Sequence, residues 1–179
     1  MKIEHKNRIE IDLENIDPEN GLVLRMEKPF GFFFNEGDGV NGVGNVTAEL
    51  ALTKAGEDIF VTGRVEGTVK LQCSRCLAEY GMTLAPAIEA PFFPRAAESP
   101  EGEEEDDGDV NFHDGEKLDL FPVLRDHLLL AIPFKPLCME ECKGLCPKCG
   151  ADLNTAPCGC TPKEPDARFA ALQKLKERL

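Results

Sequence analysis

Eight cysteines constrain this chain of 179 residues more than any other feature, and six of them lie within 23 consecutive residues. From Cys138 to Cys160 their spacing is C-x3-C-x3-C-x2-C-x8-C-x-C, and a further C-x2-C pair stands at Cys73 and Cys76. Structural zinc takes four soft ligands in a tetrahedral arrangement, and a C-x2-C step supplies two thiolates from one tight turn. The pattern therefore predicts a Cys-rich zinc-binding segment over residues 135–162.

The last four cysteines form the first candidate site. Cys146 and Cys149 make a C-x2-C step with a proline inside it and a glycine after it, and Cys158 and Cys160 make a C-x-C pair across a short loop. We predict that these four thiolates bind one Zn2+, which is structural because a closed all-thiolate site leaves no position for water. Residues 133–165 hold few large apolar side chains. Metal ligation, of order 10 kcal/mol per site, is therefore predicted to offset most of their chain entropy.

The remaining four cysteines, Cys73, Cys76, Cys138 and Cys142, form two more closely spaced pairs, which suggests a second zinc site. The alternatives are a single site with a different ligand set, a partly oxidised pair, a redox-active C-x-x-C at Cys73 and Cys76, and an iron–sulfur cluster. A disulfide framework also fits an even number of cysteines. The lack of a secretory signal favours reduced thiols instead.

Charge and missing motifs limit the classes of function. The net charge of −13 disfavours a broad basic face for nucleic acid and suits a basic partner such as a ribosomal protein. Residues 1–10 lack the apolar region of a signal peptide, and no run approaches a membrane span, so we expect a cytoplasmic protein with no membrane contact. Walker, H-E-x-x-H and G-x-S-x-G motifs are absent, and the three histidines form no catalytic pattern. We expect no enzyme, no catalytic residue and no small-molecule substrate.

Hydrophobic patterning predicts an α+β fold. Alternating or β-branched runs over 8–13, 46–53, 59–71 and 78–93 indicate strands, so we expect a β-rich domain over 1–94, built as a small antiparallel β-barrel or sandwich. Gly63 and Gly67 interrupt the third run, as β-bulges do.

The second half of the chain predicts a loop and two helices. Residues 95–115 include eight acidic residues between 95 and 109 and read as a disordered loop, with a calcium site as the sharper alternative. Apolar residues at helical spacing predict a helix over 119–132, capped by Asp119, within a segment 116–134 that packs on the β-rich domain. A second amphipathic helix is expected within 163–179, capped by Asp166.

Several of these motifs occur together in a known family. They are Cys73-Ser74-Arg75-Cys76 after a strand, Asp119-Leu120 at a helix start, Pro136-Leu137-Cys138, the run Cys142 to Gly150, Leu153-Asn154, Cys158-Gly159-Cys160, and Asp166 with Arg168 in the last helix. Over about residues 60–179 the chain resembles the YceD family of large-subunit ribosomal RNA accumulation proteins. Ala167 departs from the proline that is usual there.

The resemblance implies a non-enzymatic role in ribosome biogenesis, near the maturation of large-subunit RNA. A ribosomal protein or large-subunit pre-rRNA is then the expected partner, and the charge balance favours the protein. The oligomeric state stays open. The alternative is a cytosolic thiol redox or metal-responsive switch that uses Cys73 and Cys76. The candidate partner-binding residues are the basic side chains close to the cysteines or in the last helix, namely Arg75, Lys143, Lys148 and Arg168.

Overall fold

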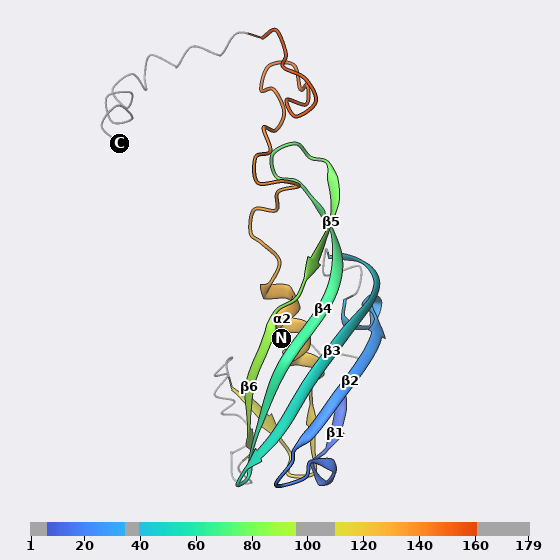
Figure 1. Ribbon diagram of the computed structural model, residues 1–179, viewed down its shortest axis with the longest axis vertical. Helices are drawn as coiled ribbons and strands as arrows, with labels where there is room; N and C mark the ends of the chain where they lie inside the picture. The colour runs from blue at the N-terminus through green and yellow to red at the C-terminus, as the bar shows by residue number, and fades with distance from the viewer. Residues whose placement is uncertain (1–6, 35–39, 96–109, 161–179) are drawn as a thin grey trace, which may run out of the picture.

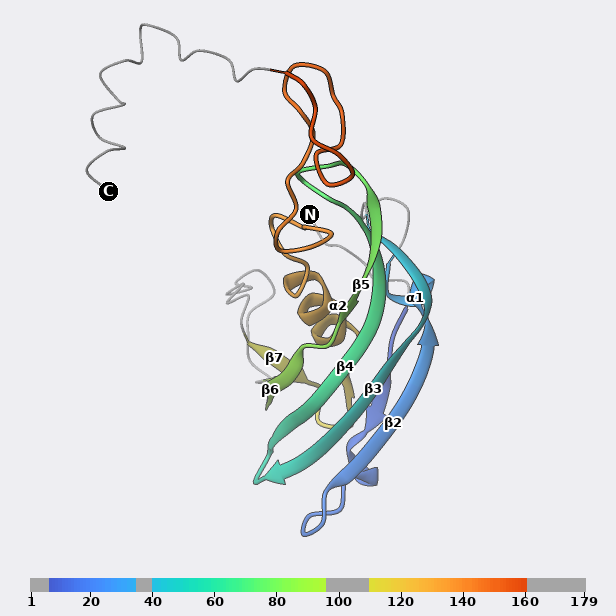
Figure 2. The same cartoon turned by 45° about the horizontal axis from the view of Figure 1, so that its top comes forward.

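The computed structural model describes residues 7–34, 40–95 and 110–160. A strongly bent β-sheet carries one helix on one face, and the Cys-rich segment continues beyond one end of the sheet (Figure 1). Turning the molecule brings this segment forward and shows the strands curving around the helix (Figure 2). The strands are β1 (Glu10–Asp12), β2 (Leu22–Pro29), β3 (Asn41–Ala55), β4 (Asp58–Gln72), β5 (Glu79–Leu84), β6 (Ala87–Pro94), β7 (Asn111–His113) and β8 (Lys117–Asp119). The helices are η1 (Leu13–Asn15), α1 (Phe30–Phe33) and α2 (Phe121–Leu130).

The main sheet is open, so the expected barrel is wrong. Its strand order is β2-β3-β4-β6-β7, with β5 also paired to β4, and β1 and β8 form a separate two-stranded sheet. The pairs are antiparallel except for β6 and β7, which run parallel. Within the described residues the sheet does not close on itself. The physical reason is that α2 fills the inner face, which removes the need for a second sheet to cover it.

The hairpin of β3 and β4 is the frame of the molecule. Each strand has 15 residues, which corresponds to roughly 50 Å at the rise of a β-strand. In β3 the buried side chains alternate strictly, from Val46 through Ala48 and Leu50 to Leu52. This alternation places one face of the sheet in the core. Because β4 is so long, its last residues extend together with β5 toward the Cys-rich segment (Figure 1), and Cys73 follows directly after its last residue, Gln72.

Helix α2 covers the inner face of the sheet. Its side chains Phe121, Val123, Leu124 and Leu128 are buried in the same cluster as the inward residues of β3, β4 and β6. Two N–H groups, of Phe121 and Ile9, each donate to Asp119 Oδ1 over 2.9 Å. The predicted cap therefore does bind the helix start. However, the N-cap position is Leu120, so Asp119 lies one residue earlier and also ties down the N-terminal segment.

The bulge lies on a different strand from the one we expected. Gly63 stays in regular register with Leu50 and Ile88. The irregularity falls on β3 between Val43 and Thr47, where Gly44 has φ +74°. Gly67 lies opposite this irregularity, on β4 between the two segments of regular pairing. The predicted glycine is therefore at the position of the bulge, but the extra residues belong to β3.

Two predicted elements lie partly or wholly outside the described residues. The acidic run over 96–109 lies outside them, but β7 forms inside the segment 95–115 that we expected to be a loop. The predicted C-terminal helix over 163–179 lies entirely outside them, and with it Arg168.

Candidate metal centres

The eight cysteines come together as two groups of four. We call the first the N-terminal centre (Cys73, Cys76, Cys138, Cys142) and the second the C-terminal centre (Cys146, Cys149, Cys158, Cys160). Within each group all sulfur atoms lie within 4.8 Å of one another, and none is in a disulfide. The structure thus brings together the same two sets of four residues that the spacing suggested. Their role as metal ligands stays a prediction.

Sulfur–sulfur distances test whether a metal ion fits. Four thiolates at 2.3 Å from one ion stand about 3.8 Å apart along each edge of the tetrahedron. In the N-terminal centre, Cys73 Sγ lies 3.7 Å from Cys142 Sγ, and Cys76 Sγ lies 3.6 Å from Cys138 Sγ. These separations suit four thiolates around one ion. Since the sulfur atoms of the C-terminal centre also lie within 4.8 Å of one another, both groups can hold a metal ion.

The C-terminal centre is built on a tight turn at Cys146. The Gly150 N–H donates to the Cys146 carbonyl over 2.9 Å, and the Cys146 N–H donates to the Ala151 carbonyl over 2.8 Å. Inside the turn, the Lys148 N–H points at Cys146 Sγ over 3.4 Å. Gly150 has φ +73°, which glycine adopts without a steric penalty. The turn therefore aims an N–H group at a sulfur atom, as a thiolate ligand requires.

The N-terminal centre repeats this turn at Cys73. The Leu77 N–H donates to the Cys73 carbonyl over 2.9 Å, and the Cys73 N–H donates to the Ala78 carbonyl over 2.9 Å. The Arg75 N–H lies 3.5 Å from Cys73 Sγ. Leu77 occupies the place of the glycine and has φ +61°, the only positive φ of a non-glycine residue in the described chain. The same hydrogen-bond pattern thus forms in both centres, and in the N-terminal centre it places Leu77 in a strained backbone conformation.

Charge is divided unequally among the thiols of each group. Backbone N–H groups of Cys149 and Lys148 lower the pKa of Cys146 to about 6. Burial raises the pKa of Cys73, but N–H groups of three residues outweigh it and bring the pKa to about 6. Burial together with the neighbouring thiols raises the pKa of Cys138 to about 12. Four adjacent thiols cannot all ionise without a cation, and a divalent ion removes that repulsion.

Burial distinguishes the two centres. Cys73, Cys76 and Cys142 are buried, and half-buried Tyr80, Leu137 and Leu145 pack around them. In the C-terminal centre, Cys149 and Cys160 are exposed. An apolar shell limits the access of water and competing ligands to a metal site. The N-terminal centre is therefore the protected one, and the C-terminal centre faces solvent.

Three of the four candidate partner-binding residues lie beside the centres. Arg75 Nη1 donates to the Cys142 carbonyl over 2.7 Å, so this side chain links the two halves of the N-terminal centre. Lys143 and Lys148 are exposed. Phe134 lies close to the same cysteines in sequence, is 97% exposed, and was not among the residues that the sequence motifs singled out. The run Pro133-Phe134-Lys135-Pro136 places an aromatic residue beside a lysine just before Cys138, and this pattern could have identified Phe134 as a candidate contact residue.

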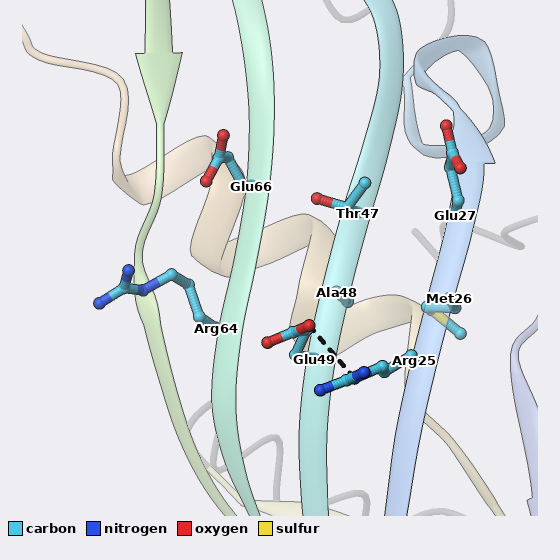
Figure 3. A pocket seen from close by; sticks show the side chains of 8 residues that line it. All are labelled: Arg25, Met26, Glu27, Thr47, Ala48, Glu49, Arg64 and Glu66. Atoms are coloured by element: carbon cyan, nitrogen blue, oxygen red, sulfur yellow. Dashed lines mark ion pairs between the residues drawn. The ribbon is translucent and has the colours of Figure 1, made fainter.

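The outer face of the sheet carries a hollow. It is lined by residues of β2, β3 and β4, and its charged side chains lie on the face opposite α2 (Figure 3). Arg25 Nε lies 3.2 Å from Glu49 Oε1, and both side chains are well exposed. Exposed ion pairs of this kind contribute about 0–1 kcal/mol. The lining contains neither histidine nor cysteine, and its chemistry is that of solvated cross-strand pairs.

Among the described residues, no helix is long and apolar enough to span a membrane. The fold and the two four-sulfur groups define a β-sheet protein with a Cys-rich extension that can hold metal ions. The chain belongs to the YceD family, since the family model described as large ribosomal RNA subunit accumulation protein YceD matches residues 61–176. That match covers most of β4, helix α2 and all eight cysteines.

Curated relatives are similar over part of their length. Uncharacterized proteins of Mycobacterium tuberculosis and Mycobacterium bovis are each 32% identical over 128 residues, 71% of this chain. The match spans only 60% of these relatives. An Arabidopsis thaliana protein named large ribosomal RNA subunit accumulation protein YCED homolog 1, chloroplastic, is 36% identical over 63 residues, 35% of this chain and 20% of its own length. No solved structure matches the chain.

Proposed function

We propose that this protein is a non-enzymatic zinc-binding factor of the cytoplasm that supports accumulation of large-subunit ribosomal RNA. The observation that carries the proposal is the family match, which includes both four-sulfur groups. A plant relative carries this role in its name. The protein acts by binding a ribosomal protein or large-subunit pre-rRNA, and its net charge of −13 favours the protein.

Zinc is the metal that the sulfur geometry favours. It accepts four thiolates in a tetrahedron and has no need of an open position. A four-iron cluster places each thiolate on a different iron, which spreads the sulfur atoms further apart than the 3.6 and 3.7 Å of the N-terminal centre. In each centre the ion would neutralise the thiolates and fix the turn that carries them. Residues 135–162 then form a zinc-held segment between the helical segment 116–134 and the C-terminal helix proposed for 163–179.

The partner surface is proposed around the centres. Lys143 and Lys148 stand on the exposed side of the Cys-rich segment, and Arg75 and Arg168 complete the candidate set. Phe134 adds a large exposed ring beside Lys135. Aromatic and basic side chains together suit either a ribosomal protein surface or the bases of single-stranded RNA.

The redox alternative has less support. A thioredoxin-like C-x-x-C precedes a helix, whereas Cys73 and Cys76 lie in a turn between β4 and β5. Each of these two sulfur atoms also lies next to a cysteine of the second pair. Thiol reactivity separates the two functions. Zinc thiolates resist alkylation until a chelator is added, whereas a redox pair is cycled by thioredoxin-like reductants.

A depletion and rescue experiment tests the function. Cells that lack the protein should accumulate less mature large-subunit rRNA, and the wild-type chain should restore it and co-sediment with large-subunit precursors. The charge reversal Lys143→Glu with Lys148→Glu should reduce both, while Lys70→Glu, an exposed lysine of β4, should behave as wild type. Failure of the wild-type protein to co-sediment with or crosslink to these precursors would contradict the proposal.

A further inference from the structure

The side chain of Asn154 belongs to the loop of one centre and contacts a cysteine of the other. In sequence it lies between Cys149 and Cys158, both of the C-terminal centre. Its Nδ2 donates to Cys142 Sγ of the N-terminal centre over 3.4 Å. Its Oδ1 accepts the N–H of Lys143 over 2.7 Å. One amide therefore holds both the sulfur of a cysteine and the backbone of the next residue.

Two hydrogen bonds to Asp152 fix the orientation of the Asn154 amide. Asp152 Oδ1 accepts from the Asn154 backbone N–H over 2.9 Å and from Nδ2 over 2.8 Å. Nδ2 has two hydrogens, so it can serve Asp152 and Cys142 together. The loop turns back on itself at Asp152 and presents the amide toward the other centre.

A short strip of backbone joins the two centres. It begins at Cys142 and ends at Cys146, and Leu145 forms an antiparallel bridge with Asp152. The Leu153 N–H donates to the Gly144 carbonyl over 2.9 Å. The loop of the C-terminal centre thus lies along the strip that connects both centres, with Asn154 at its far end.

The position of this loop depends on the C-terminal centre. None of the residues 147–160 belongs to either buried apolar cluster or packs against one. Apart from its hydrogen bonds to the strip from Cys142 to Cys146, ligation at Cys149 and Cys158 is then the restraint on the segment between them. Losing the metal there frees the loop, and a free loop presents the amide only part of the time.

We propose that Asn154 is a positioning residue that couples the two metal centres, so that filling the C-terminal centre strengthens metal binding at the N-terminal centre. The inference rests on the proposed binding of zinc. A donor to a metal-bound ligand is typically worth about 10–100-fold in metal affinity. Coupling between two binding events is reciprocal, so zinc in the N-terminal centre strengthens the C-terminal one by the same factor.

Asn154→Asp removes the donor and keeps the acceptor. The new carboxylate still accepts from Lys143 N but cannot donate to Cys142 Sγ or to Asp152 Oδ1, and it is repelled by the thiolates and by Asp152. Asn154→Ala removes all three side-chain hydrogen bonds without adding charge. The matched control is Asn20→Asp, because Asn20 Nδ2 likewise donates to an aspartate, Asp17, over 3.1 Å, far from the cysteines.

The readout resolves each centre separately. The intact chain is held at a series of buffered free zinc concentrations, alkylated briefly and digested, and peptide mass spectrometry gives the zinc dependence of protection at Cys76 and at Cys149. Asn154→Asp and Asn154→Ala should shift protection of Cys76 to about 10–100-fold higher zinc. Asn20→Asp should match wild type. Protection of Cys76 that is unchanged in both Asn154 variants overturns the inference.

A double-mutant cycle tests the route of the coupling. Disabling the C-terminal centre with Cys158→Ser and Cys160→Ser should weaken protection of Cys76 by a similar factor. Adding Asn154→Asp in that background should change it by less than about threefold, because the amide is no longer presented. Effects that multiply would show independent actions and contradict the coupling. If wild type shows no zinc-dependent protection at all, the zinc proposal itself fails, which is a distinct result.

Discussion

Replacing Gly144 with alanine should weaken zinc binding more than the same replacement at Gly150. The two glycines have positive φ values of +75° and +73°, a conformation that costs a residue with a side chain about 1–2 kcal/mol. Only Gly144 is also crowded. A Cβ there would lie 2.9 Å from the Arg75 carbonyl oxygen, whereas nothing lies within 4 Å of a Cβ at Gly150.

The crowded oxygen holds the two centres together. The Arg75 carbonyl accepts from the Leu145 N–H over 3.1 Å, which joins the Cys73–Cys76 turn to the strip that leads to Cys146. Displacing it forfeits about 1 kcal/mol of hydrogen bonding and adds about 1 kcal/mol of overpacking. The difference between the variants is then about 2 kcal/mol, or about 30-fold in apparent zinc affinity.

Competition against a chelator of known affinity measures this difference. Both variants lose the same freedom in the unfolded chain, so that contribution cancels in the comparison. The pH is held fixed because protons compete with zinc for thiolates. Equal affinities for Gly144→Ala and Gly150→Ala would refute the close packing of the Arg75 backbone against the strip between the centres.

Three further changes have expected outcomes. Leu77→Gly should be more stable to denaturant than Leu77→Ala by about 1 kcal/mol, reversing their usual order, because position 77 has positive φ; the usual order would contradict the turn geometry. Gly42→Ala should lower the melting temperature, since its Cβ would overlap the Phe30 ring and overpacking costs about 1–3 kcal/mol. Gly81→Ala, whose nearest atom is at 3.9 Å, is the control, and equal melting temperatures would count against the packing. Apparent zinc affinity should fall as the pH is lowered, because neighbouring thiols and burial raise the pKa of Cys160 to about 12 and zinc must displace the proton of this thiol. The expected loss is about tenfold per displaced proton and pH unit. A zinc affinity that does not change with pH would exclude thiolate ligation at Cys160.

Local patterns in the sequence predicted the long elements well. The alternation over 46–53 and 59–71 marks the buried faces of β3 and β4, and helical spacing marks α2. Strand β2 was missed although Leu22, Leu24 and Met26 alternate, because Val23 between them is also apolar and disguises the period. The alternation over 8–13 predicted β1, which is a short strand within that run, whereas the three-residue strands β7 and β8 are too short for any period to show.

What covers a buried face is not encoded locally. Alternation states that one side of a strand is apolar but does not name its partner, so a second sheet and a helix predict the same pattern. Phe33 stacks on Phe121 with ring centroids 5.7 Å apart, a contact between segments nearly ninety residues apart. Such long-range contacts, which local patterns do not reveal, distinguish the open sheet covered by α2 from the barrel or sandwich that we expected.

The same distinction applies to the cysteines. Each close pair follows from a tight turn, which spacing reveals. The grouping of Cys76 with Cys138 was suggested only because these pairs remained after the first site was assigned, and their approach depends on where β4 ends relative to the chain after α2. The role of Asn154 was likewise out of reach, because its acceptor is a sulfur atom of the other centre.

The metal content of the purified chain tests the central claim most directly. Elemental analysis of protein prepared in reducing buffer should give two zinc ions per chain, and Cys158→Ser with Cys160→Ser should reduce the ratio to one. The contrary result would be a chain that carries no transition metal while its backbone amides from Cys138 to Cys160 remain protected against hydrogen exchange. In that case the Cys-rich segment would fold without metal, which contradicts a metal-held segment.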